Sequence, residues 1–74
     1  MEIFPRIEVK EEIKGGIPVI KGTRIPVDLV LSALAGGMSI EEVMKEYDLQ
    51  KEDILAAIAF AAEKIKEERY RLVA

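Results

Sequence analysis

Nine consecutive apolar residues decide the fold, and they read Ile54-Leu55-Ala56-Ala57-Ile58-Ala59-Phe60-Ala61-Ala62. A run of this length is too short to span a bilayer. Glu52 and Asp53 precede it and suit the first turn of a helix, where the helix dipole favours negative charge. We therefore predict a helix that begins near Lys51 and continues through a charged segment to about Leu72.

The predicted helix has no polar face over residues 54–62, whereas a surface helix of a monomer has an apolar stripe and a polar side. One side can pack on the rest of the chain. The other side also has to leave water, and a second copy is the simplest partner. We expect a homodimer interface that includes Leu55, Ile58, Ala59, Phe60 and Ala62. The alternative is that residues 54–62 form the central core helix of a monomer.

Two shorter helices are predicted upstream. Ser39 and Glu42 have the spacing of a capping box, in which the hydroxyl and the carboxylate each satisfy a backbone amide. Apolar residues at helical spacing follow, which predicts a helix over Ser39–Tyr47. An earlier helix is predicted over Val27–Ala35, and it ends at Gly36-Gly37 because glycine accepts a left-handed C-cap.

Residues 7–27 are predicted to form an extended arm with short strands and turns. Ile7-Glu8-Val9 alternates as a strand does, and Gly15-Gly16 indicates a turn. Pro18 and Pro26 keep the strands short or at an edge, since proline cannot donate to a ladder. We therefore expect one mainly helical domain over residues 1–74, with the arm at 7–27 and three helices within 27–72.

The composition excludes several classes of function. Cysteine and histidine are absent, so the chain has no disulfide, no Cys/His zinc site, no thiol nucleophile and no imidazole base. We therefore expect neither an enzyme nor a cofactor or metal site. A chain of 74 residues buries only about 62% of its unfolded surface, which again favours a partner chain.

Localisation and source are predicted from composition as well. The N-terminus lacks the basic and apolar stretches of a secretory signal, so we expect a soluble, cytoplasmic protein without a membrane segment. Asparagine is absent and the charged residues are nearly all lysine, arginine or glutamate. That balance is typical of a thermophile.

The two C-terminal helices have the spacing of a helix–turn–helix motif. Residues 39–53, however, hold six acidic and two basic side chains, a net charge of −4. DNA binding depends on neutralising phosphate charge. We therefore expect the shape of a helix–turn–helix without major-groove reading by the last helix.

A short basic stretch is the exception. Lys14, Lys21 and Arg24 are the only charged residues between positions 12 and 28, and glycines around them allow a ligand to approach the backbone. Together with Thr23 they could contact phosphate or an acidic groove of a protein. The alternative is an ordinary solvated turn in which Arg24 pairs with Asp28.

Three segments carry a resemblance to a known family. They are Gly16-Ile17-Pro18-Val19-Ile20-Lys21-Gly22-Thr23-Arg24-Ile25-Pro26-Val27, Leu34-Ala35-Gly36-Gly37-Met38-Ser39-Ile40-Glu41-Glu42-Val43 and Glu52-Asp53-Ile54-Leu55-Ala56-Ala57-Ile58-Ala59-Phe60-Ala61-Ala62. Over roughly residues 7–65 the chain resembles the family called domain of unknown function 433. Gln50 stands where many relatives have a threonine helix cap.

The resemblance implies a homeodomain-like helical fold with short N-terminal strands, usually dimeric. Relatives often lie beside genes for ribonuclease toxins with PIN domains and are described as antitoxin-like, and no catalytic residue is attached to them. We therefore expect a non-catalytic, antitoxin-like homodimer that binds a toxin of the PIN type, with DNA as a further partner through Lys14, Lys21, Thr23 and Arg24. The alternative is a homodimerisation or scaffolding module without a nucleic-acid role.

Overall fold

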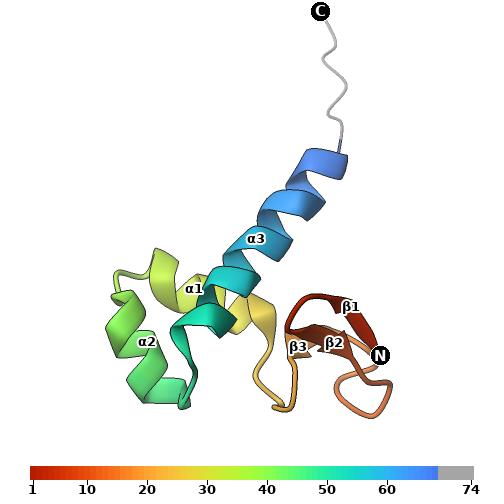
Figure 1. The fold of residues 1–74 in the computed structure, drawn as a ribbon, viewed down its shortest axis with the longest axis horizontal. Helices are drawn as coiled ribbons and strands as arrows, with labels where there is room; N and C mark the ends of the chain where they lie inside the picture. Colours follow the sequence, from red (N-terminus) through yellow and green to blue (C-terminus); the bar gives the residue numbers. More distant parts are fainter. Residues whose placement is uncertain (69–74) are drawn as a thin grey trace, which may run out of the picture.

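The structure is a computed structural model that describes residues 1–68 of the 74. It contains a small antiparallel sheet followed by three helices (Figure 1). In chain order these elements are β1 (Glu2–Phe4), β2 (Ile7–Val9), β3 (Pro18–Ile20), α1 (Val27–Ala35), α2 (Ile40–Tyr47) and α3 (Lys51–Glu67).

The sheet has the strand order β1-β2-β3, with both pairs antiparallel. β2 lies in the middle, with Ile7 opposite Ile20 on one side and Phe4 on the other. Sequence analysis placed β2 and β3 within the extended arm at residues 7–27 but did not predict β1, since the arm began at residue 7. After β3, the arm makes an isolated bridge between Val19 and Pro26.

α1 and α2 have the predicted bounds, and the capping box at Ser39 is confirmed. The Glu42 amide donates to the Ser39 hydroxyl at 3.0 Å, and the Ser39 amide donates to the Glu42 carboxylate at 2.7 Å. At the end of α1 the left-handed residue is Gly37, with φ 107°, whereas Gly36 stays right-handed. This turn lets the chain reverse into α2.

α3 begins at Lys51 as predicted but ends at Glu67, earlier than the predicted Leu72. Glu68 has an extended backbone, with ψ 144°, and its amide donates to the Ile65 carbonyl. Residues 69–72 lie outside the described part of the chain. Within residues 1–68 the end of α3 is exposed on all sides, so it has little of the tertiary packing on which helix stability mainly depends.

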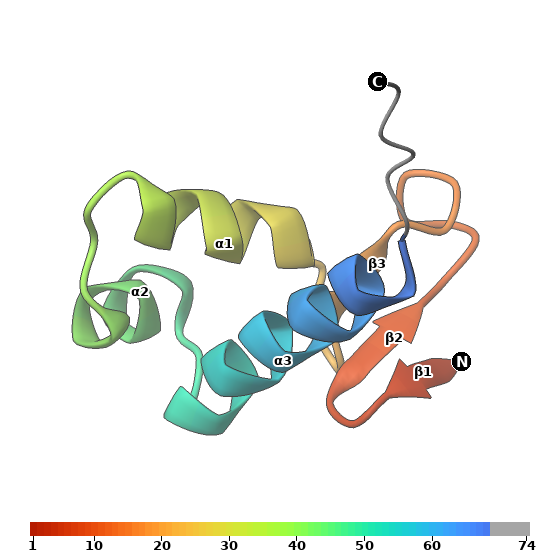
Figure 2. The same ribbon diagram turned by 90° about the horizontal axis from the view of Figure 1, so that it is seen from above.

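The core lies where the three helices meet β2 and β3. Figure 2 shows α3 running between α1 and α2 on one side and the sheet on the other. Side chains from all these elements are fully buried there, including Ile7, Ile20, Val30, Val43 and Ile54. The sheet therefore closes one side of α3 and the helices close another.

Candidate interaction surfaces

One face of α3 belongs to the core. Ile54, Ala57 and Phe60 are buried on it. The Phe60 ring is only 7% exposed and meets Phe4 of β1 edge to face, with ring centroids 5.5 Å apart. Phe60, which sequence analysis expected at the interface, is thus buried within its own chain, because the unpredicted strand β1 supplies a ring that covers it.

A second face of α3 is apolar and open to solvent. Leu55 is 47% exposed, Ile58 39% and Ile65 63%, and the predicted interface residues Ala59 and Ala62 are also exposed. We call these five residues the α3 stripe. Ile65 was missed by sequence analysis, although its position three residues after Ala62 continues the spacing and could have revealed it.

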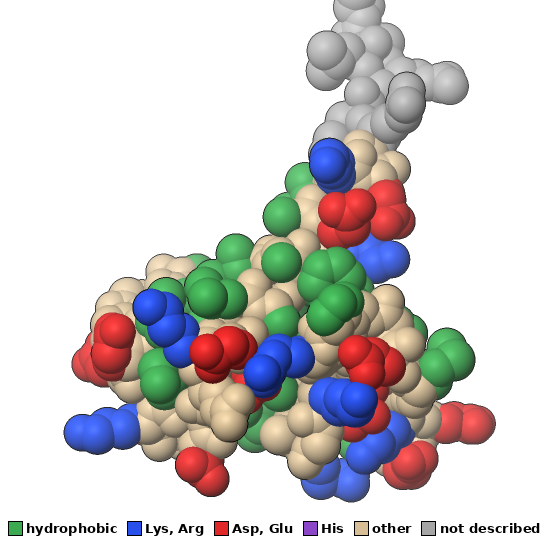
Figure 3. Space-filling model, viewed as in Figure 1, with side chains coloured by type: hydrophobic (Ala, Val, Ile, Leu, Met, Phe, Trp, Pro, Cys, Tyr) green, Lys and Arg blue, Asp and Glu red, His purple; other side chains and the backbone are tan. Residues whose placement is uncertain are grey.

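The C-terminal end of α3 projects from the body of the molecule (Figure 1). Every side chain over residues 62–67 is exposed, and Lys64 is the one that reaches back, with its ammonium 5.7 Å from the Phe60 ring centroid. Figure 3 shows hydrophobic side chains gathered along α3 and over the neighbouring part of the molecule, with mixed charges near its end. The α3 stripe thus continues onto a helix end that residues 1–68 leave exposed.

The N-terminus of α3 is tied to the sheet by an arginine that sequence analysis did not single out. The Arg6 guanidinium donates to the Asp53 carboxylate at 2.8 Å and to the Gln50 side-chain oxygen at 3.3 Å. Asp53 also accepts from the Gln50 amide at 2.9 Å. Asp53 therefore caps α3 where a threonine side chain is lacking, and the ion pair orients α3 on the β1–β2 turn.

The α2–turn–α3 unit joins two helices through a short turn and has an acidic outer surface. Asp48, with φ 54°, turns the chain between the two helices. A shallow depression on α2 is lined by six residues, two of which are apolar: Glu41, Glu42, Met44, Lys45, Asp48 and Leu49. Three carboxylates and one lysine line this depression, which makes it a poor surface for phosphate.

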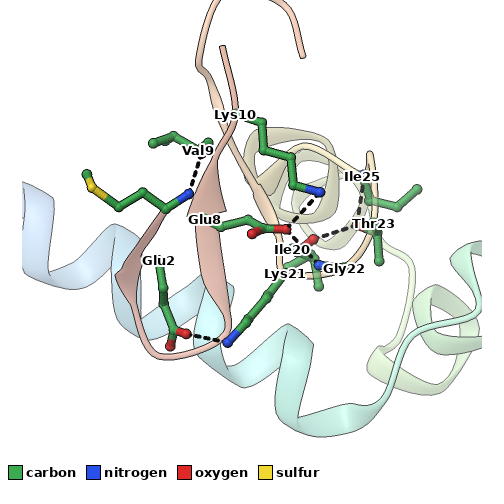
Figure 4. Close-up of polar contacts among 10 residues, drawn as sticks. Glu2, Glu8, Val9, Lys10, Ile20, Lys21, Gly22, Thr23 and Ile25 are labelled. Carbon is green, nitrogen blue, oxygen red and sulfur yellow. Dashed lines mark hydrogen bonds and ion pairs between the residues drawn. The ribbon is translucent and has the colours of Figure 1, made fainter. Parts of the chain in front are cut away.

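The basic stretch contains residues that other parts of the chain hold in place and residues that are open to solvent. Figure 4 shows the contacts of Lys21 and Thr23, which belong to the first group. Lys21 lies 2.6 Å from the Glu2 carboxylate. This contact lowers the pKa of Glu2 and raises the pKa of Lys21. The Thr23 hydroxyl donates to the Ile20 carbonyl at 2.7 Å and accepts from the Ile25 amide at 3.0 Å. Lys21 and Thr23 thus have partners within the chain.

The same turn is fixed by a carboxylate that is nearly buried. Glu8 is 9% exposed and accepts from the Gly22 amide at 2.8 Å. This bond, together with Lys10 at 3.4 Å, holds the pKa of Glu8 below its ordinary value. Gly22 has φ 80°, a conformation that suits glycine and strains other residues, so glycine is needed there.

Lys14 and Arg24 are the open members of the basic stretch. Both side chains are exposed, and within residues 1–68 neither forms an ion pair. The alternative pairing of Arg24 with Asp28 is likewise not formed in this part of the chain. Lys14, which lies before β3, and Arg24, which lies after it, thus remain available for contacts with a partner.

Neither a metal centre nor a membrane span is found in the described part of the chain. Residues 1–68 contain no cluster of three or more metal-ligating side chains. Among the helices of that part, none has the length and apolar content needed to cross a bilayer.

Together these features define a small three-helix domain with an N-terminal antiparallel sheet and an exposed apolar helix face. The model of a family described as protein of unknown function (DUF433) matches residues 7–61. This match covers most of the 74 residues, and the chain belongs to that family. Neither a curated protein nor a solved structure matched the chain.

Proposed function

We propose that this chain is a non-catalytic binding protein that works as a homodimer, with the α3 stripe as the surface through which two copies associate. The observation that carries the proposal is the exposure of Leu55, Ile58 and Ile65 on one side of a projecting helix. Contiguous apolar patches of this kind are unusual on soluble monomers and typically mark interaction sites. Association also adds the burial that a chain of this size lacks.

Sedimentation analysis of the wild type and of Ala59→Glu tests this proposal. Ala59 is exposed within the α3 stripe, and a glutamate there would have to lose water without a partner on association. We expect a dimeric wild type and a folded, monomeric variant. Ala35→Glu, the same change at an exposed position of α1, is the matched control and should stay dimeric. A wild type that is a single chain at micromolar concentration would contradict the proposal.

The proposed partner is a toxin of the PIN ribonuclease type, so that the dimer acts as an antitoxin-like protein. What the resemblance implies about relatives of this chain supports this assignment, and the exposed cations Lys14 and Arg24 offer a contact to an acidic groove or to phosphate. The toxin-binding test is co-expression with a ribonuclease encoded by the adjacent gene, followed by recovery on the tagged chain. The double variant Lys14→Glu/Arg24→Glu should recover less toxin than Lys45→Glu, an exposed control on α2.

A gel-shift titration against the DNA upstream of the gene distinguishes a DNA-binding function from a scaffolding function. A salt-sensitive complex that is lost in Lys14→Glu/Arg24→Glu would assign the open cations to phosphate contact. If the dimer retains neither toxin nor DNA, the scaffolding module is the function that remains. The α3 stripe alone is sufficient for that second candidate.

A further inference from the structure

The spacing of the α3 stripe is that of a two-helix seam. Leu55, Ile58, Ala62 and Ile65 follow one another at intervals of three, four and three residues, the repeat by which two helices interlock side chains. Leu55 and Ala62 share one seam position, and Ile58 and Ile65 share the other. All four side chains are exposed. A helix with the same spacing is therefore a fitting occupant, and a second α3 provides it.

Charges on the flank of the seam distinguish the two directions in which a second α3 can lie. Glu52 and Lys66 stand seven residues before and seven residues after Ala59, so all three share one flanking position of the repeat. In an antiparallel pair Glu52 faces the partner's Lys66, and Lys66 faces the partner's Glu52. In a parallel pair, Glu52 instead lies level with the partner's Glu52 and Lys66 with the partner's Lys66, so these opposite charges do not face each other.

Both flanking charges are free to make these contacts. Glu52 and Lys66 are exposed, and neither forms an ion pair within residues 1–68. The same register brings Leu55 near the partner's Ile65 and Ile58 near the partner's Ala62, each offset by two residues, or about 3 Å, along the helix. Ala59 then lies on the two-fold axis, where its small side chain lets the helices approach closely.

The projecting end of α3 gives a second reason for the antiparallel direction. Residues 62–67 are exposed around the whole helix, so they gain little packing from the rest of residues 1–68. An antiparallel partner presents its Leu55 and Ile58 to this end, next to the body of the partner. Each projecting end is thereby covered by the base of the other helix.

We propose that α3 pairs with α3 of a second copy in an antiparallel direction, with the α3 stripe as the seam and two symmetric ion pairs between Glu52 and Lys66. This inference rests on the proposed homodimer, to which it adds direction and register.

Charge reversal tests the register. Glu52→Lys and Lys66→Glu each turn both ion pairs into like-charge contacts, and each should raise the dimer dissociation constant by about two- to thirtyfold. The double variant Glu52→Lys/Lys66→Glu should return it to within about twofold of the wild type. Glu41→Lys on α2 is the control and should change little. The losses should shrink at high salt, because exposed charges are screened.

Cross-linking tests the direction without disturbing the seam. Because the chain has no native cysteine, Glu52→Cys and Lys66→Cys each carry a single thiol. In the antiparallel pair the two copies of either cysteine are about 21 Å apart along the helix, so a short bismaleimide should link only a mixture of the two variants. Self-linking of each variant alone would overturn the antiparallel direction.

The outcomes separate this inference from the proposed dimer. If charge reversal leaves the dissociation constant of a stable dimer unchanged, or the double variant is as weak as the singles, the register is wrong although the homodimer stands. If the wild type itself is monomeric, the proposed function fails first. Circular dichroism of every variant confirms that α3 is still folded.

Discussion

The substitution Phe60→Leu separates core from interface on α3. The ring is 7% exposed and contacts Phe4 edge to face at a centroid distance of 5.5 Å. Leucine retains most of the apolar volume but loses the ring pair, worth about 0.5–1.5 kcal/mol, and its different shape adds up to about 1.5 kcal/mol. We expect a loss of about 0.5–3 kcal/mol, out of roughly 4–11 kcal/mol for a chain of this length. The midpoint of thermal unfolding should fall by about 2–24 °C.

The assay is thermal unfolding followed by circular dichroism over a wide range of protein concentration. Association stabilises a folded chain by mass action, so an interface residue matters only where the wild type is associated. Phe60→Leu should lower the midpoint at every concentration. Ile58→Ala, two residues away and 39% exposed, should lower it only at concentrations that support the dimer. If the effect of Phe60→Leu disappears on dilution, the ring lies at an intermolecular contact and our assignment is wrong.

Two further predictions concern the cap of α2 and the buried carboxylate. Ser39→Ala removes the hydroxyl that accepts from the Glu42 amide and should cost about 1 kcal/mol in urea unfolding, whereas an unchanged midpoint would mean that water replaces this cap. The pKa of Glu8 is lowered in the fold by the Gly22 amide, so its stabilising contribution is present above the ordinary glutamate pKa and is lost as the pH falls through the folded value. Stability measured against pH should therefore fall less steeply on the acid side in Glu8→Gln, and an equal slope would show that Glu8 is not the group that titrates.

The helix bounds were predictable because their signals are local. The pair Ser39 and Glu42 marks the start of α2 by itself, and Gly36-Gly37 marks the end of α1 without reference to any other part of the chain. The same holds for the start of α3, where acidic residues occupy the first turn. Each of these signals acts within one turn of helix, so no knowledge of the tertiary structure is needed.

The contacts of the N-terminal strand could not be predicted in this way. β1 has only three residues and gains its place by pairing with β2 and by covering Phe60. Arg6 reaches Asp53 across 47 positions of sequence, a separation that no local pattern reports. The interface prediction for Phe60 overlooked Phe4 for the same reason, because an apolar run indicates that residues are buried but not which residues cover them.

The residues of an apolar run such as 54–62 can be assigned to different faces of the helix only once the structure is known. Successive residues of a helix are about 100° apart, so Ile58 and Phe60 point to nearly opposite sides although one residue separates them. The sheet packs against the side of α3 that carries Phe60, and the side that carries Ile58 stays exposed. An all-apolar helix in a small domain therefore supports two contacts at once, one within the chain and one proposed with a second copy.

The proposed seam also bears on the use of the helix–turn–helix. A DNA-reading unit keeps the N-terminal face of its second helix open to the major groove. Here that end of α3 holds Asp53, which is bound by Arg6, and Glu52, which flanks the proposed seam. Dimerisation through α3 and groove reading through α3 would compete for the same face. Any nucleic-acid contact of the dimer should therefore run through Lys14 and Arg24, and a gel shift that survives Lys14→Glu/Arg24→Glu but not Lys51→Glu would refute this division of roles.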